Sequence, residues 1–309
     1  MPRPIRIATR ASRLAVWQAE HVAQLLRAAA PDVPVELLHV TTVGDRDQTA
    51  RLSAFGGLGV FTREVQKAVL DGTADIAVHS LKDLPTESAI GLVLAAVPAR
   101  EETADALVLP ATAEKGENLT ALRPGANLGT GSLRRQAQLL HLRRDFRMSD
   151  VRGNVETRLK KLDAGEFDAL VLAVAGLKRL GLDGRISFEL EPPLVYPAVG
   201  QGALGIECRE NDVETTALLS KVDDPASRNR VTAERALLAR LRAGCHAPVG
   251  AATSYQGEQL VLEAVVLSVD GKVRVCATGA GLPANAAALG REVADQLLQK
   301  GADRLIAAL

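Results

Sequence analysis

Apolar segments that alternate between strand-like and helix-like spacing fill the first third of the chain. Residues 5–9 and 35–42 read as strands, and the segment between them has one apolar helical face that Ser12 can cap. A second helix is predicted over 61–71, and a buried strand over 74–80. This β-α-β-α-β order predicts a mainly parallel sheet flanked by helices.

The same alternation begins again near residue 100 and predicts a second α/β unit. Its strands include residues 105–110 and a segment within 168–180, and its helices fall within 127–142 and 152–166. The apolar, Gly-rich segment 197–209 is expected to return the chain to the first unit. A chain that repeats one α/β pattern in this way is expected to form two sheets.

A third pattern starts at Asp224-Pro225, where a capping residue precedes a proline at the first helical position. A helix is predicted over 226–242, strands over 259–268 and 272–279, and a terminal helix over 284–299. Strands that are adjacent in sequence and flanked by helices predict a small α+β domain.

Length, charge and cysteine content limit the class of protein. The 309 residues are too many for one ordinary core, so two or three domains are expected. A formal net charge of zero gives no overall attraction to nucleic acid or to a membrane surface. No apolar stretch is long enough to span a bilayer, and the N-terminus has no apolar signal core, so a cytoplasmic protein is expected. Cys208, Cys245 and Cys276 fit neither a disulfide framework nor a zinc site, which indicates a reducing compartment. Cys208 and Cys276 lie in strand-like segments and are expected in the core.

A basic region lies within this neutral chain. Between residues 123 and 185 there are 13 Lys and Arg against 7 Asp and Glu. Arg134 and Arg135 fall in the first turn of a predicted helix, where free N–H groups favour anions, and Arg152 and Arg158 flank the start of the next helix. Guanidinium groups bind carboxylates, so the pattern favours an anionic ligand. Solvated helix faces with salt bridges are the alternative, and nucleic acid is disfavoured because stacking aromatic residues are scarce.

The predicted strand 74–80 leads into a polar turn, HSLKDLP. In open parallel sheets, ligands bind outside the carboxyl ends of strands. Lys82 and Asp83 would lie there, where they could bind an anionic group and transfer protons; a turn held by an ion pair explains them equally well. No metal site is predicted at His79, because no other His or Cys is suitably spaced.

Cys245 follows the predicted helix 226–242 in a Gly/Pro turn. The carboxyl end of a helix carries negative partial charge, which disfavours a thiolate, so this thiol does not read as a helix-activated nucleophile. Two interpretations stay open on local sequence alone: a small structural residue, or an exposed attachment point on a loop.

Taken together, the segments resemble the porphobilinogen deaminase (hydroxymethylbilane synthase) family of tetrapyrrole and heme biosynthesis. The resemblance extends from Ile5 to about Ile306. Long matches in one order make it specific. The motifs that carry it are IATRASRLAVWQ, TTVGDRD, ADIAVHSLKDLP, GTGSLRRQAQL, RGNVETRLKKLDAGEFDALVLAVAGLKRLG, PAVGQGALGIE and VTAERALLARLRAGCHAPVG.

The resemblance implies an α/β fold with three domains. Two are periplasmic-binding-protein-like (type II), with mainly parallel mixed sheets around a cleft, and the third is a smaller α+β C-terminal domain. The expected boundaries are 1–99 with 199–218 for the first domain, 100–198 for the second and 219–309 for the third. A cytoplasmic monomer is expected, with no nucleic-acid or membrane partner and with a transient contact to the next enzyme of the pathway.

The resemblance also implies a transferase that joins four porphobilinogen molecules head to tail, with loss of ammonia, and releases hydroxymethylbilane. Its cofactor is a dipyrromethane held by a thioether, and Cys245 matches the attachment position. Asp83 matches the catalytic aspartate, which can hydrogen-bond pyrrole N–H groups, assist the departing amine and stabilise the cation left behind. The residues implied to bind cofactor and substrate are Arg10, Ser12, Lys82, Thr130, Ser132, Arg134, Arg135, Arg152, Arg158 and Arg179.

Three positions depart from the family pattern. Leu58 replaces a lysine that is common in the Gly-rich loop, Gly131 replaces a serine at a helix start, and Ala243 replaces a glycine before Cys245. None of these changes removes the implied anchor or catalytic group. The competing hypotheses are a non-catalytic two-domain binder of small anions, which would have no use for Asp83 and Cys245 together, and a family member without turnover, for which Leu58 is the one hint.

Overall fold

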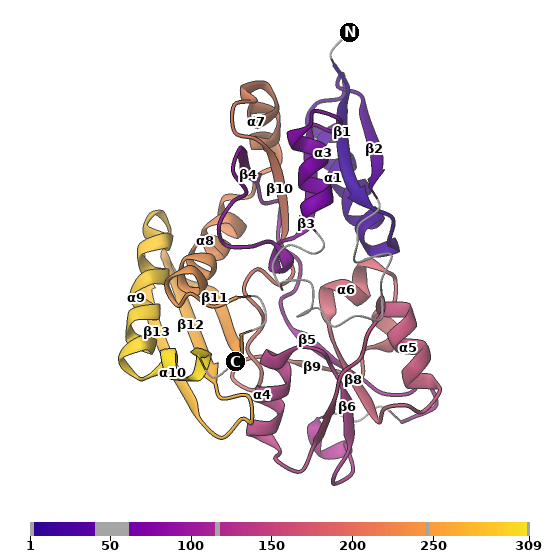
Figure 1. Cartoon of the computed structure of the whole chain (residues 1–309), viewed down its shortest axis with the longest axis vertical. Helices are drawn as coiled ribbons and strands as arrows, with labels where there is room; N and C mark the ends of the chain where they lie inside the picture. The colour runs from indigo at the N-terminus through magenta and orange to yellow at the C-terminus, as the bar shows by residue number, and fades with distance from the viewer. Residues whose placement is uncertain (1–2, 41–61, 115–117, 245–246, 308–309) are drawn as a thin grey trace. The chain divides into compact units, whose positions relative to one another are not determined.

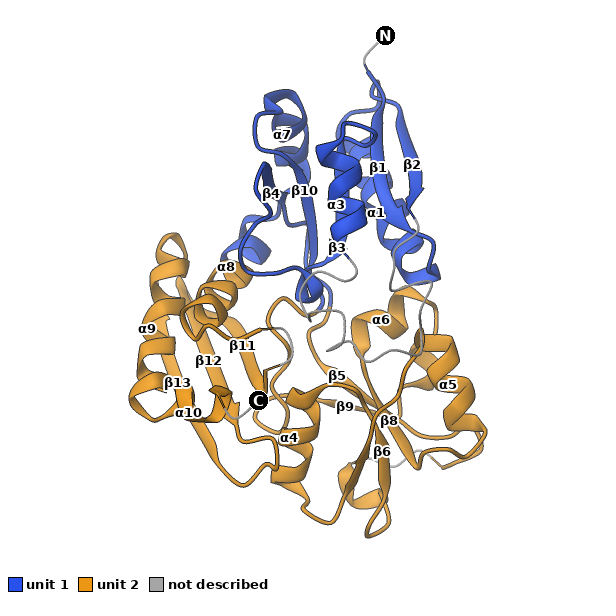
Figure 2. Cartoon of the chain, viewed as in Figure 1, with its two compact units in different colours: residues 1–101, 202–229 blue, residues 102–201, 230–309 orange. Residues whose placement is uncertain are grey.

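The computed structural model describes residues 3–40, 62–114, 118–244 and 247–307 (Figure 1). The chain divides into two compact units (Figure 2). Unit 1 comprises residues 1–101 and 202–229, and unit 2 comprises residues 102–201 and 230–309.

A five-stranded mixed sheet forms the centre of unit 1, in the order β2-β1-β3-β10-β4. The first three of these strands run parallel, and β10 is antiparallel to both of its neighbours. The elements of unit 1 include β1 (Ile5–Arg10), α1 (Arg13–Ala29), β2 (Val35–Val40), α3 (Arg63–Leu70), β3 (Ile76–Ser80), the 3-10 turn η2 (Leu81–Asp83), β4 (Leu92–Ala96), β10 (Leu204–Arg209), α7 (Val213–Leu219) and the 3-10 turn η5 (Ser220–Val222).

The alternation of side chains along β1 explains why helices pack on both faces of this sheet. Ile5 and Ile7 pack with the buried side of α1, whereas Ala8 packs with Val65 and Val69 of α3. α1 begins where the sequence predicts, because the Ser12 side chain accepts a hydrogen bond from the Ala15 N–H. These contacts fix the carboxyl end of β1 against the start of α1.

Unit 2 contains a second five-stranded sheet with an equivalent topology, in the order β7-β6-β8-β5-β9. β6 is parallel to β7 and β8, and β5 is antiparallel to β8 and β9, as β10 is to its neighbours in unit 1. The predicted pair of mixed α/β sheets is therefore confirmed. The elements are β5 (Asp105–Val108), the 3-10 turns η3 (Leu119–Ala121) and η4 (Asp183–Arg185), β6 (Asn127–Gly129), α4 (Leu133–Leu142), β7 (Arg147–Ser149), α5 (Val155–Asp163), β8 (Ala169–Ala173), α6 (Val174–Arg179) and β9 (Phe188–Leu190).

The remainder of unit 2 is a three-stranded antiparallel sheet, β11-β12-β13, that packs against helices. It confirms the predicted small α+β part. Strand β11 is not among the sequence predictions, and it pairs with β12 along its whole length. The elements are α8 (Pro225–Arg240), β11 (Val249–Gln256), β12 (Gln259–Leu267), β13 (Arg274–Gly281), the 3-10 turn η6 (Pro283–Asn285), α9 (Ala286–Gln299) and α10 (Ala302–Ala307). The first five residues of α8, 225–229, belong to unit 1.

One expectation from the sequence is wrong. Cys208 and Cys276 both lie in strand-like segments and are expected in the core, but only Cys208 is buried, and Cys276 is exposed. Cys276 lies in β13, which has one neighbouring strand, and its side chain points away from the core-facing side on which Ala277 lies. The division into three domains, residues 1–99 with 199–218, residues 100–198 and residues 219–309, stays a prediction.

Candidate active site

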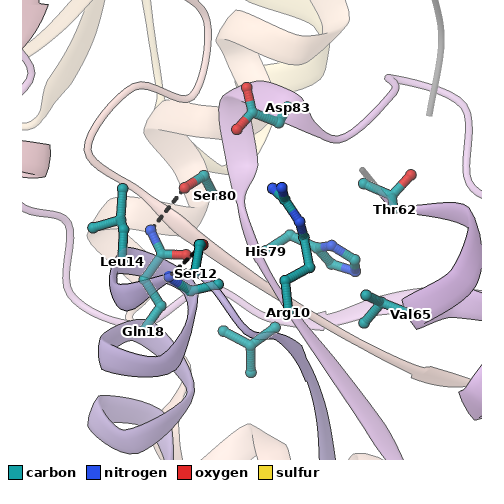
Figure 3. A pocket seen from close by; sticks show the side chains of 11 residues that line it. Arg10, Ser12, Leu14, Gln18, Thr62, Val65, His79, Ser80 and Asp83 are labelled. Carbon is teal, nitrogen blue, oxygen red and sulfur yellow. Dashed lines mark hydrogen bonds between the residues drawn. The ribbon is translucent and has the colours of Figure 1, made fainter. Parts of the chain in front are cut away.

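The carboxyl ends of β1 and β3 in unit 1 surround a cavity of about 90 Å³ (Figure 3). Three of the predicted site residues line it: Arg10, Ser12 and Asp83. The other lining residues are Leu14, Ala15, Gln18, Thr62, Val65, Val78, His79 and Ser80.

Local structure explains how Asp83 reaches the rim of this cavity. It closes the short turn η2, in which Leu81 is buried and its N–H donates to the Ala203 carbonyl over 3.0 Å. Leu84 is also buried, and its N–H donates back to the Leu81 carbonyl. With both leucines directed inward, Lys82 is half-buried between them and the Asp83 carboxylate is exposed.

Two polar side chains that line the cavity, Gln18 and Ser80, hold each other in place through a hydrogen bond. Gln18 is buried in α1, and its Nε2 donates to the Ser80 Oγ over 2.7 Å (Figure 3). Arg10, at the last position of β1, extends its guanidinium group along the cavity in the direction of Asp83 (Figure 3). The cavity therefore combines a cation, a carboxylate and neutral hydrogen-bonding groups.

A buried pair of titratable groups, His79 and Glu207, adjoins these side chains. The His79 Nε2 is 2.9 Å from the Glu207 Oε2, and the two side chains are 4% and 1% exposed. Gln66 of α3 donates from Nε2 to the same carboxylate oxygen over 2.9 Å. His79 lines the cavity, whereas Glu207 and Gln66 are buried and are not among the lining residues.

In unit 2, Arg134 and Arg135 at the start of α4 bind one fully buried aspartate. The Arg134 Nη1 is 2.7 Å from the Asp105 Oδ2, and the Arg135 Nε and Nη2 donate to the Asp105 Oδ1 over 3.0 and 2.7 Å. Burial opposes ionisation of Asp105, but the two guanidinium groups outweigh it and hold the pKa of this carboxyl far below its usual range. The cluster therefore carries two positive charges and one negative charge.

Neighbouring groups hold this cluster in place. The Arg134 Nη1 also donates to the Tyr196 carbonyl over 2.6 Å, and Gln138 holds the Tyr196 backbone by accepting from its N–H and donating to its carbonyl. Gln201 donates to the Asp105 Oδ1 over 2.9 Å. The Arg134 Nε is buried and has no hydrogen-bond partner in the described part of the chain.

The other predicted residues of unit 2 occupy helix starts and helices. Thr130 is buried and accepts from the Ser132 N–H, and Ser132 caps α4 by accepting from the Arg135 N–H. Arg158 donates from Nε to the Gly153 carbonyl. Arg152 is half-buried before α5, and Arg179 is buried in α6. Cys245 and Leu58 lie outside the described residues.

Sequence reasoning missed several buried polar groups of these sites, among them Asp105, Glu207 and Gln18. The first two carried a signal, since each is an acid within an otherwise apolar strand segment, DALVLP and GALGIE. Buried carboxylates persist only when partners compensate the loss of water, so an acid in such a segment predicts a partner. The identity of that partner requires the fold.

Comparison with known proteins gives matches over nearly the whole chain. The family model described as "Porphobilinogen deaminase, dipyromethane cofactor binding domain" matches residues 5–217, and "Porphobilinogen deaminase, C-terminal domain" matches residues 229–299. Proteins named porphobilinogen deaminase are similar along their length. That of Syntrophotalea carbinolica is 46% identical over 305 residues, covering 99% of this chain and 96% of the relative. That of Chromobacterium violaceum is 47% identical over 305 residues, covering 99% and 97%.

Solved structures give more distant matches. The periplasmic VFT2 domain of Bordetella pertussis BvgS aligns with 71% of this chain and 86% of its own, at a TM-score of 0.42 and 16% identity. The BenM effector-binding domain with benzoate aligns with 72% and 91%, at a TM-score of 0.43 and 16% identity. In the described ranges, no helix is both long and apolar enough to cross a bilayer, and no group of three or more His, Cys, Asp or Glu residues is placed to hold a metal ion.

Proposed function

This chain belongs to the porphobilinogen deaminase family, and on that basis we propose how its residues divide the work of the reaction. The enzyme joins four porphobilinogen molecules head to tail on a covalently held dipyrromethane, with loss of ammonia at each addition, and releases hydroxymethylbilane. Each step breaks a C–N bond and leaves positive charge on a pyrrole unit that also carries two carboxylates.

Asp83 is the catalytic carboxylate of this proposal. Loss of ammonia develops a cation, and a fixed carboxylate placed beside it stabilises charge that appears only as the bond breaks. The single observation that supports this role is the position of Asp83, exposed at the rim of a cavity that Arg10 and Ser12 also line. A carboxylate at the rim can hydrogen-bond pyrrole N–H groups while the cavity holds the substituents.

Arg10, Ser12 and Lys82 bind the acetate and propionate groups of the substrate. Guanidinium groups bind carboxylates through two parallel hydrogen bonds, which fixes orientation as well as charge. Arg10 is the guanidinium group among the residues that line the cavity. In unit 2, the corresponding proposed set is Thr130, Ser132, Arg134, Arg135, Arg152, Arg158 and Arg179.

The buried arginine cluster fits a cofactor that carries carboxylates. Asp105 neutralises one of the two guanidinium groups, so one positive charge is left over, and the Arg134 Nε has no partner in the described part of the chain. We assign Arg134 and Arg135 to hold carboxylates of the dipyrromethane, and Cys245 to form its thioether. When bound, the dipyrromethane supplies the end to which the first porphobilinogen unit is joined.

The remaining proposals concern the location, the oligomeric state and the domain boundaries of the enzyme. The enzyme is proposed to be a cytoplasmic monomer that makes a transient contact with the next enzyme of the pathway. Its domains are proposed to be residues 1–99 with 199–218, residues 100–198 and residues 219–309. Sedimentation of the loaded enzyme across a range of concentrations tests the monomer.

Arg10→Gln is expected to lower kcat/KM for porphobilinogen by about 10- to 100-fold, because a charge-assisted hydrogen bond contributes roughly 1.5–3 kcal/mol. Steady-state kinetics with porphobilinogen measure the change. Arg13→Gln is the matched control, since Arg13 is an exposed arginine of α1 that does not line the cavity. Equal values of kcat/KM for both variants and the unchanged enzyme would remove this cavity as the substrate site.

A further inference from the structure

The buried pair His79–Glu207 has no role in the reaction as assigned above, yet His79 lines the cavity that holds Arg10 and Asp83 (Figure 3). Glu207 reaches this point from β10, the antiparallel neighbour of β3. Among the described residues, neither its Oε1 nor the His79 Nε2 has a hydrogen-bond partner, although that Nε2 is 2.9 Å from the Glu207 Oε2. A buried polar atom without a partner lowers stability, so its retention calls for an explanation in function.

The contact with Glu207 determines how the His79 ring is used. At 2.9 Å a carboxylate oxygen repels a ring lone pair, so in a neutral imidazole the proton is on the nitrogen that faces Glu207, Nε2, although the two atoms are not aligned as a hydrogen bond. The lone pair is then on Nδ1. No residue in the described part of the chain forms a hydrogen bond with Nδ1, and the side chain lies in the cavity wall.

A carboxylate that orients an imidazole, whose second nitrogen faces a reactant, is the arrangement that enzymes use for a general base. Gln66 completes the support, because its Nε2 holds the Glu207 oxygen that contacts the ring. Gln66 belongs to α3, which also contributes Val65 to the cavity. The base and its two supporting groups thus come from β3, β10 and α3, all within unit 1.

The reaction requires such a base. When the aminomethyl carbon of porphobilinogen forms its new C–C bond, the C–N bond has broken and ammonia has left. The acceptor pyrrole must then lose the hydrogen on its α-carbon; the electrons of that C–H bond restore the aromatic ring, and the proton needs an acceptor.

We propose that His79 is that acceptor and that Glu207 is its positioning residue. His79 Nδ1 takes the α-proton and releases it to solvent, where the ammonia expelled in the same addition takes up one proton and becomes ammonium, so that atoms and charge balance over each addition. This assignment rests on the proposed function of the cavity. It separates two tasks: Asp83 stabilises the cation during C–N cleavage, and His79 removes the proton after C–C formation.

The test uses porphobilinogen deuterated at its free α-carbon, with the dipyrromethane-loaded enzyme. His79→Asn is expected to slow turnover by about 100-fold or more, the usual contribution of a positioned base. Its deuterium isotope effect on turnover is expected to exceed that of the unchanged enzyme, because removal of the α-proton becomes the slow step. A slower variant with an unchanged isotope effect would show that His79 is only structural and would overturn the proposal.

Glu207→Gln keeps the shape of the side chain and removes its charge. We expect it to lose less rate than His79→Asn and, like that variant, to show a larger isotope effect than the unchanged enzyme. It also provides the measurement if His79→Asn does not fold, and an isotope effect equal to that of the unchanged enzyme then overturns the proposal. His39→Asn, an exposed histidine of β2, is the control and is expected to change neither quantity. Failure of the proposed function gives a different result: the unchanged enzyme would itself form no hydroxymethylbilane.

Discussion

Asp83→Asn is expected to fold, to acquire dipyrromethane and to turn over about 100-fold or more slowly than the unchanged enzyme. The amide keeps the shape and some hydrogen bonding but lacks the negative charge that stabilises a developing cation. Because the Asp83 side chain is exposed, its replacement leaves the core unchanged. This loss should be larger than that of Arg10→Gln, since Asp83 acts on charge that appears in the transition state.

The rate of hydroxymethylbilane formation measures the loss of turnover, and the intact mass of the variant shows whether it has acquired dipyrromethane. Asp32→Asn, another exposed aspartate of unit 1, is the control and should retain the rate of the unchanged enzyme. If Asp83→Asn carried the cofactor and turned over at the normal rate, the assigned role of Asp83 would be wrong.

Asp105→Asn is expected to lower the free energy of unfolding by about 3–5 kcal/mol, because removing one partner of a buried ion pair leaves uncompensated charge. Here two buried guanidinium groups lose their shared carboxylate. Urea unfolding followed by circular dichroism measures the loss. Asp295→Asn is the control, since its pair with Arg240 is about half exposed and should contribute at most about 1 kcal/mol.

The ion pairs of Asp105 with Arg134 and Arg135 also make the stability of the enzyme depend on pH. The folded-state pKa of Asp105 is held far below its unfolded-state value of 3.8, so its contribution to stability is present above that value and is lost as the pH falls through the folded pKa. The difference in stability between the unchanged enzyme and Asp105→Asn should therefore narrow as the pH is lowered below 3.8. A difference that stayed constant down to acid denaturation would contradict an ionised Asp105.

Periodic patterns explain which parts of the fold could be predicted. Ile5 and Ile7 alternate with residues of the opposite face, and Ser12 caps the helix that packs on them, so a short window contains all the information needed. Strand β11 was missed because its sequence, VGAATSYQ, is small and polar over much of its length. Its strand conformation comes from pairing with β12, which the local sequence does not reveal.

The supporting groups of the sites were beyond sequence reasoning for a related reason. Gln66 and Glu207 are 141 positions apart in the chain, and Arg135 and Asp105 are 30 positions apart. Only the fold brings such groups together, because β10 pairs with β3 after the chain has traversed most of unit 2. Local sequence identifies a buried acid as unusual, but the tertiary structure assigns its partner.

The intact mass of the purified protein shows whether this chain builds and keeps a dipyrromethane on Cys245. The purified enzyme is expected to be heavier than its polypeptide by one dipyrromethane, whereas Cys245→Ser, checked for folding by circular dichroism, is expected to show the bare polypeptide mass. Bare mass for both proteins after incubation with porphobilinogen would show that no dipyrromethane is built on this chain and would leave a binder of anionic ligands as the better description.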